Sequence, residues 1–159
     1  KNYNFIVVST GHKEDHRNSS YFDNIQKYIK LNDLQINYKY IGMVNYSEVL
    51  SLMYHCVALI NPSKFEGRHS SLEQARSLGK QMLLSKINIH KEQSPPRSLY
   101  FNKEQSLELA KLMKKTWVNY SAKKNPFYYN KAVKKNKLDL IKYYKNWEKV
   151  VTEALNLNH

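Results

Sequence analysis

The sequence is short of the residues that would place it in several common classes of protein. One cysteine, Cys56, occurs among 159 residues, so no disulfide can form within the chain and a reducing cytoplasm is the simplest setting. No apolar run approaches the roughly 20 residues that a transmembrane helix needs. No secretory signal is visible, because the short apolar stretch at residues 4–9 is followed at once by polar residues. A cytoplasmic protein is therefore expected.

Arginine is missing from the last third of the chain, although the protein is strongly basic. The net charge is +13, and residues 102–159 contribute +8 of it through 13 lysines and 5 acidic residues. Lysine suits a solvated surface, or loose attraction to anionic lipid, better than the bidentate recognition of bases that arginine provides. A solvated face is expected, with peripheral contact at the inner face of a membrane as the alternative. No nucleic acid partner is expected.

Apolar residues make up 42% of the chain, which is typical of a folded domain. Their spacing alternates between the two-residue period of strands and the 3.6-residue period of helices. Strands are predicted at residues 4–9, 37–42, 56–60 and 81–85, a short extended piece at residues 98–101, and helices at residues 20–31, 46–55, 71–78 and 103–117. This order predicts a Rossmann-like α/β fold, in which helices cover both faces of one parallel sheet.

The character of the sequence changes after this alternation ends. Residues 119–137 are rich in Asn, Lys and Tyr, and they are predicted to form a loop with at most one short helix. Apolar residues then recur at helical spacing from Leu138 to Leu155, which predicts an amphipathic helix. This helix is expected to pack on the sheet or on something outside the chain. The predicted division is a Rossmann-like lobe at residues 1–118 and a basic extension at residues 119–159.

Polar residues and glycines follow several of the predicted strands. Parallel strands place their carboxyl ends at one edge, where α/β proteins bind ligands. The positions at these ends are Ser9 to Gly11, Gly42, Asn61 to Ser63, and Ser85. The segment NPSKFEGRHSSLEQARSLGK at residues 61–80 is the most informative of them, because it joins such an end to a predicted helix that Gly79 terminates.

This segment combines groups that suit an anionic ligand carrying hydroxyls. The N–H groups at the start of the predicted helix, beside Ser70 and Ser71, can bind phosphate. Gly67 allows backbone to approach a ligand closely or to adopt a positive φ, and Arg68 and His69 add donors. Glu66 is better placed to accept hydrogen bonds from sugar hydroxyls. The other interpretation is that Glu66 is a surface acid paired with Lys64 or Arg68, and that the serines only cap the helix.

These residues resemble the carboxyl-terminal lobe of glycosyltransferase family 4 enzymes of the GT-B fold, closest to the mannosyltransferase-like branch that makes bacterial surface polysaccharides. The resemblance rests on residues 61–80 followed by LLSKINIHKEQ at residues 83–93, and it covers about residues 4–117. Further matching pieces are STG at residues 9–11, Asp15 with Arg17, IGMVNYSEVLSLM at residues 41–53, and SLYF at residues 98–101.

The resemblance implies a donor site for a sugar nucleotide. The family's two acids, eight positions apart, fall on Glu66, which would face the donor sugar as the catalytic residue, and on position 74, which would bind the ribose. Gln74 stands there, with Glu73 one place earlier, so the second acid is replaced. Gly11 would line the same site and His90 would overlook it, in contact with sugar or base or packed within its loop. Lys13 and Arg17 are candidates for contact with the diphosphate.

The implied function is the donor-binding part of a hexosyltransferase. Mannose from GDP-mannose is the guess that the branch supplies, and the acceptor would be a glycan or a lipid-linked sugar. Retention at the anomeric carbon without a metal or cofactor is also implied. The chain begins at what would be the second strand of the lobe and has no room for an acceptor lobe, so it is expected to be inactive alone. The alternatives are a non-catalytic Rossmann-like binding module and a basic domain associated with membrane or nucleic acid.

Overall fold

The computed structural model describes residues 4–13, 20–67, 70–93 and 95–156. The chain separates into two compact units, residues 1–49 and residues 50–159, with the boundary inside helix α2 (Tyr46–His55). Each unit is an α/β arrangement with a parallel sheet. The predicted boundary between residues 118 and 119 stays a prediction.

The first unit holds strands β1 (Val7–Ser9) and β2 (Tyr38–Tyr40), which pair in parallel. Helix α1 (Tyr21–Leu31) connects them along the chain and buries Ile29. A capping box closes the start of α2. The N–H of Glu48 donates to Oδ1 of Asn45, and the N–H of Asn45 donates to Oε2 of Glu48, both at 2.9 Å.

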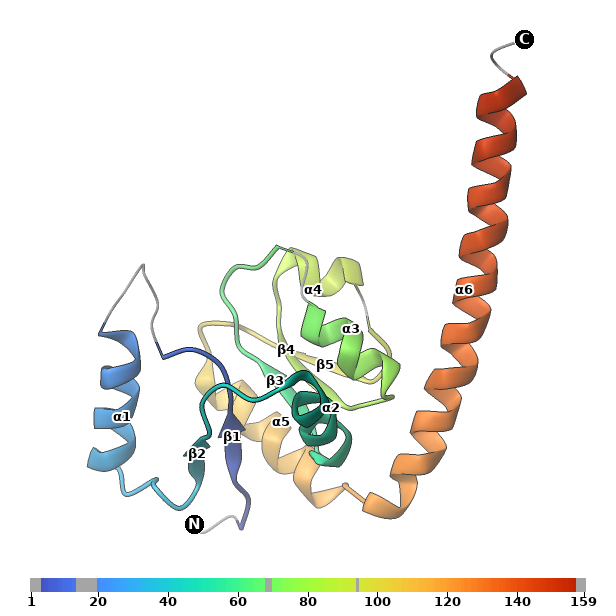
Figure 1. Ribbon diagram of the computed structural model, residues 1–159. Coiled ribbons are helices and arrows are strands. Elements are labelled where there is room, and N and C mark those ends of the chain that lie inside the picture. Colours follow the sequence, from blue (N-terminus) through green and yellow to red (C-terminus); the bar gives the residue numbers. More distant parts are fainter. Residues whose placement is uncertain (1–3, 14–19, 68–69, 94, 157–159) are drawn as a thin grey trace. The chain divides into compact units, whose positions relative to one another are not determined.

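The second unit is built on strands β3 (Leu59–Asn61), β4 (Met82–Ser85) and β5 (Ser98–Phe101), which are parallel and lie in that order. Helices α3 (Ser70–Ser77), α4 (Asn88–Gln93) and α5 (Ser106–Val118) connect or follow them (Figure 1). All four residues of β4 are buried, as expected of a central strand with both faces covered. Leu72 and Ala75 of α3 complete this core.

The predicted alternation of parallel strands and helices is confirmed, with three differences. The described strands form two sheets, one in each unit, where one sheet was predicted. The strand predicted at residues 56–60 begins at Leu59, because the N–H of Cys56 still donates to Leu52 O of α2 at 2.9 Å. Residues 88–93, predicted as loop, form the short helix α4.

The largest correction concerns residues 119–137, which were predicted as a loop. Only a short 3₁₀ turn, η1 (Ala122–Lys124), precedes helix α6 (Asn125–Asn156) among the described residues of this stretch. Pro126 suits the first turn of a helix, where its missing N–H is not needed. Aromatic contacts outweigh the weak helix propensity: Arg97 stacks on Tyr128 at 3.4 Å from the ring centroid, and Tyr54 meets Tyr129 edge-on at 5.6 Å.

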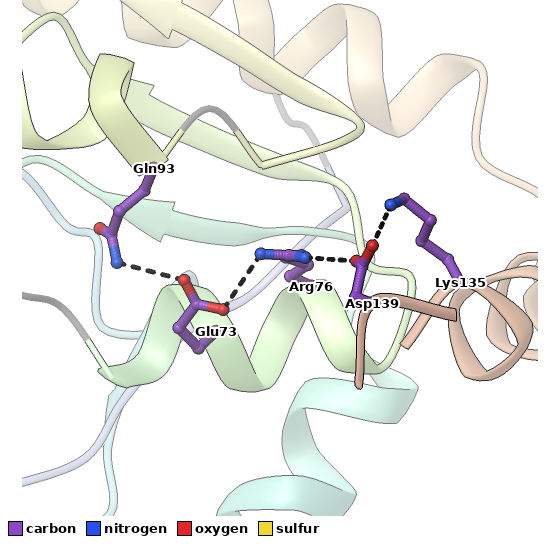
Figure 2. A network of polar contacts seen from close by, with 5 residues as sticks. All are labelled: Glu73, Arg76, Gln93, Lys135 and Asp139. Atoms are coloured by element: carbon purple, nitrogen blue, oxygen red, sulfur yellow. Dashed lines mark hydrogen bonds and ion pairs between the residues drawn. The ribbon is translucent and has the colours of Figure 1, made fainter. Parts of the chain in front are cut away.

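A polar network also holds α6 against α3 (Figure 2). Nη2 of Arg76 lies 2.9 Å from Oδ2 of Asp139, and Lys135 contacts the other oxygen of the same carboxylate. Nη1 of Arg76 reaches Glu73 on its own helix at 3.4 Å. Arg76 therefore joins acids from two helices, and this fixes the rotation of the first half of α6 about its axis.

We expect Asp139→Asn to lower the melting temperature slightly near neutral pH. The hydrogen bond from Lys135 holds the pKa of Asp139 below its ordinary value of 3.8, helped by the charges of Lys135 and Arg76. A lowered pKa contributes stability that is complete above pH 3.8 and is lost as pH falls through the lower folded value. Thermal unfolding should therefore show a wild-type advantage that shrinks in acid. Glu153→Gln, which removes a looser 3.7 Å pair with Lys149, is the control; an equal effect there would contradict the prediction.

Candidate functional site

The ends of β3 and β4 are joined by a chain of hydrogen bonds that includes Glu66. The Oγ of Ser63 donates to Oε1 of Glu66 at 2.5 Å, and the backbone N–H of Ser63 donates to Oδ1 of Asn61 at 3.0 Å. The Oγ of Ser85 donates to the carbonyl oxygen of Ser63, also at 2.5 Å. The side chains at the two strand ends therefore fix the loop at residues 62–67 and one oxygen of the Glu66 carboxylate.

His90 is the last member of this series of hydrogen bonds. Its side chain is fully buried, and its Nδ1 lies 2.9 Å from the carbonyl oxygen of Ser85. Because a carbonyl only accepts, this bond requires the proton on Nδ1. Tyr100 of β5 donates to the backbone oxygen of His90 at 3.2 Å. In this conformation His90 supports the strand end, and direct contact with a ligand would require α4 to move.

Gly67 follows Glu66 at the end of the described part of this loop. Gly67 is exposed, and a Cβ placed there would meet nothing within 4 Å. Its φ lies outside the left-handed region, so of the two predicted reasons for glycine only close approach of a ligand remains. Ser70 and Ser71 open α3, Ser70 exposed and Ser71 half-buried.

Three further residues were predicted to contact phosphate groups of the ligand. Arg17, Arg68 and His69 lie outside the described residues. Their predicted roles in binding phosphate stay predictions.

The acid that stands beside position 74 is engaged within the protein. Glu73 receives Nη1 of Arg76 on one oxygen and Nε2 of Gln93 on the other, each at 3.4 Å (Figure 2). Gln74 is half-buried on the same helix. Glu73 thus links α3, α4 and, through Arg76, α6. Both of its carboxylate oxygens therefore contact side chains of the protein.

The first unit has its own pocket at the ends of β1 and β2, with a volume of about 530 Å³. Gly11 and Gly42 line it with φ of +126° and +74°, and the N–H of Gly11 donates to the oxygen of Gly42 at 3.0 Å. His12 and Lys13 contribute the polar groups of the lining. Lys13 also lies 5.6 Å from the centre of the Tyr40 ring. An open pocket with a lysine at the carboxyl ends of parallel strands can accept an anionic group.

The structure thus brings Glu66 and His90 to one hydrogen-bonded chain in the second unit and places Gly11 at a pocket in the first. The strand ends of the first unit and those of the second unit were predicted to lie along one edge, and this stays a prediction. Sequence reasoning placed Ser63 and Ser85 at strand ends without giving either a role. A serine just beyond β3 and another at the end of β4 were the available signal.

Comparison of the chain with known protein families, with curated proteins and with solved structures found no match. Within the described parts of the chain, no group of three or more His, Cys, Asp or Glu side chains is arranged to hold a metal ion.

Proposed function

We propose that this chain is the donor-binding portion of a family 4 glycosyltransferase of the GT-B fold, acting on a nucleotide-activated hexose. The observation that carries the proposal is the placement of Glu66. Its carboxylate stands just beyond β3, is positioned by Ser63, and precedes the backbone N–H groups at the start of α3. The carboxylate can accept hydrogen bonds from sugar hydroxyls, and the N–H groups that follow it in sequence can bind phosphate.

In this proposal the donor is bound by residues of the second unit. Glu66 accepts hydrogen bonds from the sugar and orients its anomeric carbon. Gly67 and the N–H groups at the start of α3, beside Ser70 and Ser71, bind the diphosphate. The pocket of the first unit, with Gly11 and Lys13, is a separate candidate site for an anionic group. Transfer to a glycan or lipid-linked acceptor, with retention and without a metal, requires an acceptor lobe. Mannose as the sugar rests on the resemblance alone.

The second candidate is a non-catalytic Rossmann-like module that binds a different partner. The specific observation in its favour is the state of positions 73 and 74. Gln74 lacks the charge that strengthens a hydrogen bond to ribose, and Glu73 is held by Arg76 and Gln93.

Titration with GDP-mannose, other sugar nucleotides and GDP alone, followed by chemical-shift changes, tests the proposal. We expect a sugar nucleotide to bind more tightly than its nucleotide, and Glu66→Gln to weaken the sugar nucleotide about tenfold, because a lost charged hydrogen bond costs about 1.4 kcal/mol. Glu153→Gln is the control, since Glu153 is an exposed acid of α6 that pairs with Lys149 at 3.7 Å.

Two outcomes would count against it. If no sugar nucleotide binds the folded chain, the non-catalytic module is favoured. If one binds and Glu66→Gln leaves the affinity unchanged, the assignment of Glu66 to the donor sugar is wrong.

A further inference from the structure

We infer that the second half of α6, residues 140–155, binds the surface of an anionic phospholipid membrane through its apolar side. The first half of this helix packs on its own unit through Tyr128, Tyr129 and Asp139. The second half extends beyond the other elements of that unit (Figure 1). Its large apolar side chains are 39–63% exposed: Leu140, Ile141, Tyr143, Tyr144, Trp147, Val150, Val151 and Leu155.

These side chains share one side of the helix. At 100° per residue, the apolar positions from 140 to 155 fall within one half of the circumference, where Glu148 is the one charged residue and lies near an edge. The opposite half carries Lys142, Lys145 and Lys149, together with Glu153, which pairs with Lys149 at 3.7 Å. Polar and apolar halves of this width are typical of helices that lie in the interface of a bilayer.

The residue types on the polar and apolar sides of residues 140–155 favour lipid over protein as the partner. Interfaces between proteins are enriched in arginine and depleted in lysine, and residues 140–155 carry three lysines and no arginine. Lysine clusters on an amphipathic helix are typical of binding to anionic headgroups. Trp147, Tyr143 and Tyr144 are the residue types that concentrate at the boundary between headgroups and acyl chains.

Charge selects among the remaining occupants. A second copy of the chain would bring together two molecules of net charge +13, whereas an anionic membrane complements that charge. Residues 140–155 span about 24 Å at 1.5 Å per residue, which fits a helix lying along the surface. Among the described residues, no helix has both the length and the apolar character needed to pass through a bilayer.

Sedimentation of the full chain with vesicles tests this inference. We expect binding to vesicles of phosphatidylcholine mixed with phosphatidylglycerol, weak binding to phosphatidylcholine alone, and loss of the difference at high salt. In a Trp117→Phe background, the fluorescence of Trp147 should shift to shorter wavelength when anionic vesicles are added.

Two neighbouring substitutions provide a matched pair. Trp147→Asp places a charge on the apolar side and should weaken vesicle binding at least about tenfold, because the large apolar area of tryptophan is lost. Asn146→Asp adds the same charge on the polar side and should weaken it only slightly. Both residues are exposed, so both variants should keep the wild-type circular dichroism and melting temperature.

Three results would overturn the inference. The first is equal vesicle binding by the two variants. The second is a concentration-dependent dimer without lipid that Trp147→Asp abolishes, which would make a second copy the occupant. The third is binding of the wild-type chain to a polyanion such as heparin but not to anionic vesicles. That result would show that positive charge alone drives binding and that the apolar side of α6 takes no part in it.

Discussion

Replacing Gly79 by alanine should destabilise the second unit by about 3 kcal/mol or more, the largest effect we expect from a single added methyl group. Gly79 ends α3 with φ +66°, in a motif where its N–H donates to Arg76 O and the N–H of Lys80 donates to Ala75 O. A Cβ there would fall against the carbonyl oxygen of Tyr128 and 2.7 Å from its carbonyl carbon. Backbone strain and a backbone clash therefore add.

Two other glycines separate these contributions in chemical denaturation. Gly42 has φ +74° but nothing within 4 Å of its Cβ position, so Gly42→Ala should show strain without a clash. Gly67 has neither, so Gly67→Ala should be close to neutral. The expected order of destabilisation is Gly79, then Gly42, then Gly67. If Gly79→Ala costs no more than Gly42→Ala, α6 can move away from the α3 turn, and the close packing described here is wrong.

The same turn shows what a sequence can predict and what it cannot. Gly79 was correctly predicted to end α3, because that signal is local: an apolar helical period stops at a glycine. The start of α6 at Asn125 was missed because its stability depends on Arg97, which is 28 residues earlier and holds Tyr128 under its guanidinium. Contacts at that separation leave no trace in a periodic pattern. The division of the strands into two sheets was missed for the same reason.

In the candidate site, too, the local features were predicted from the sequence and the contacts between distant residues were not. Glu66 and the loop that carries it were predicted from their place between a buried strand and a capped helix. The partners that position Glu66 come from a neighbouring strand, since the Oγ of Ser85 holds the carbonyl oxygen of Ser63. His90 was predicted near the site, but its complete burial depends on α4, which was predicted as a loop.

Ser85→Ala should both destabilise the fold and weaken the binding of a sugar nucleotide. The Ser85 hydroxyl is fully buried, and without it the carbonyl oxygen of Ser63 loses a donor, at a cost of about 1–3 kcal/mol. Ser63 in turn holds Glu66, so the loop at residues 62–67 becomes freer and the carboxylate less well positioned. Urea denaturation and titration with the same sugar nucleotide measure the two effects separately.

Ser98→Ala distinguishes a local from a general effect. Ser98 lies on the neighbouring strand β5 and donates to the carbonyl oxygen of Pro95 at 2.6 Å, which is the same kind of bond at the opposite end of the sheet from Glu66. It should lower stability without changing affinity, because it leaves Ser63 and Glu66 in place. If the two variants weaken the sugar nucleotide equally, the affinity follows global stability, and the chain from Ser85 to Glu66 does not position the carboxylate. If only Ser85→Ala weakens it, the strand ends act as a preformed support for the ligand.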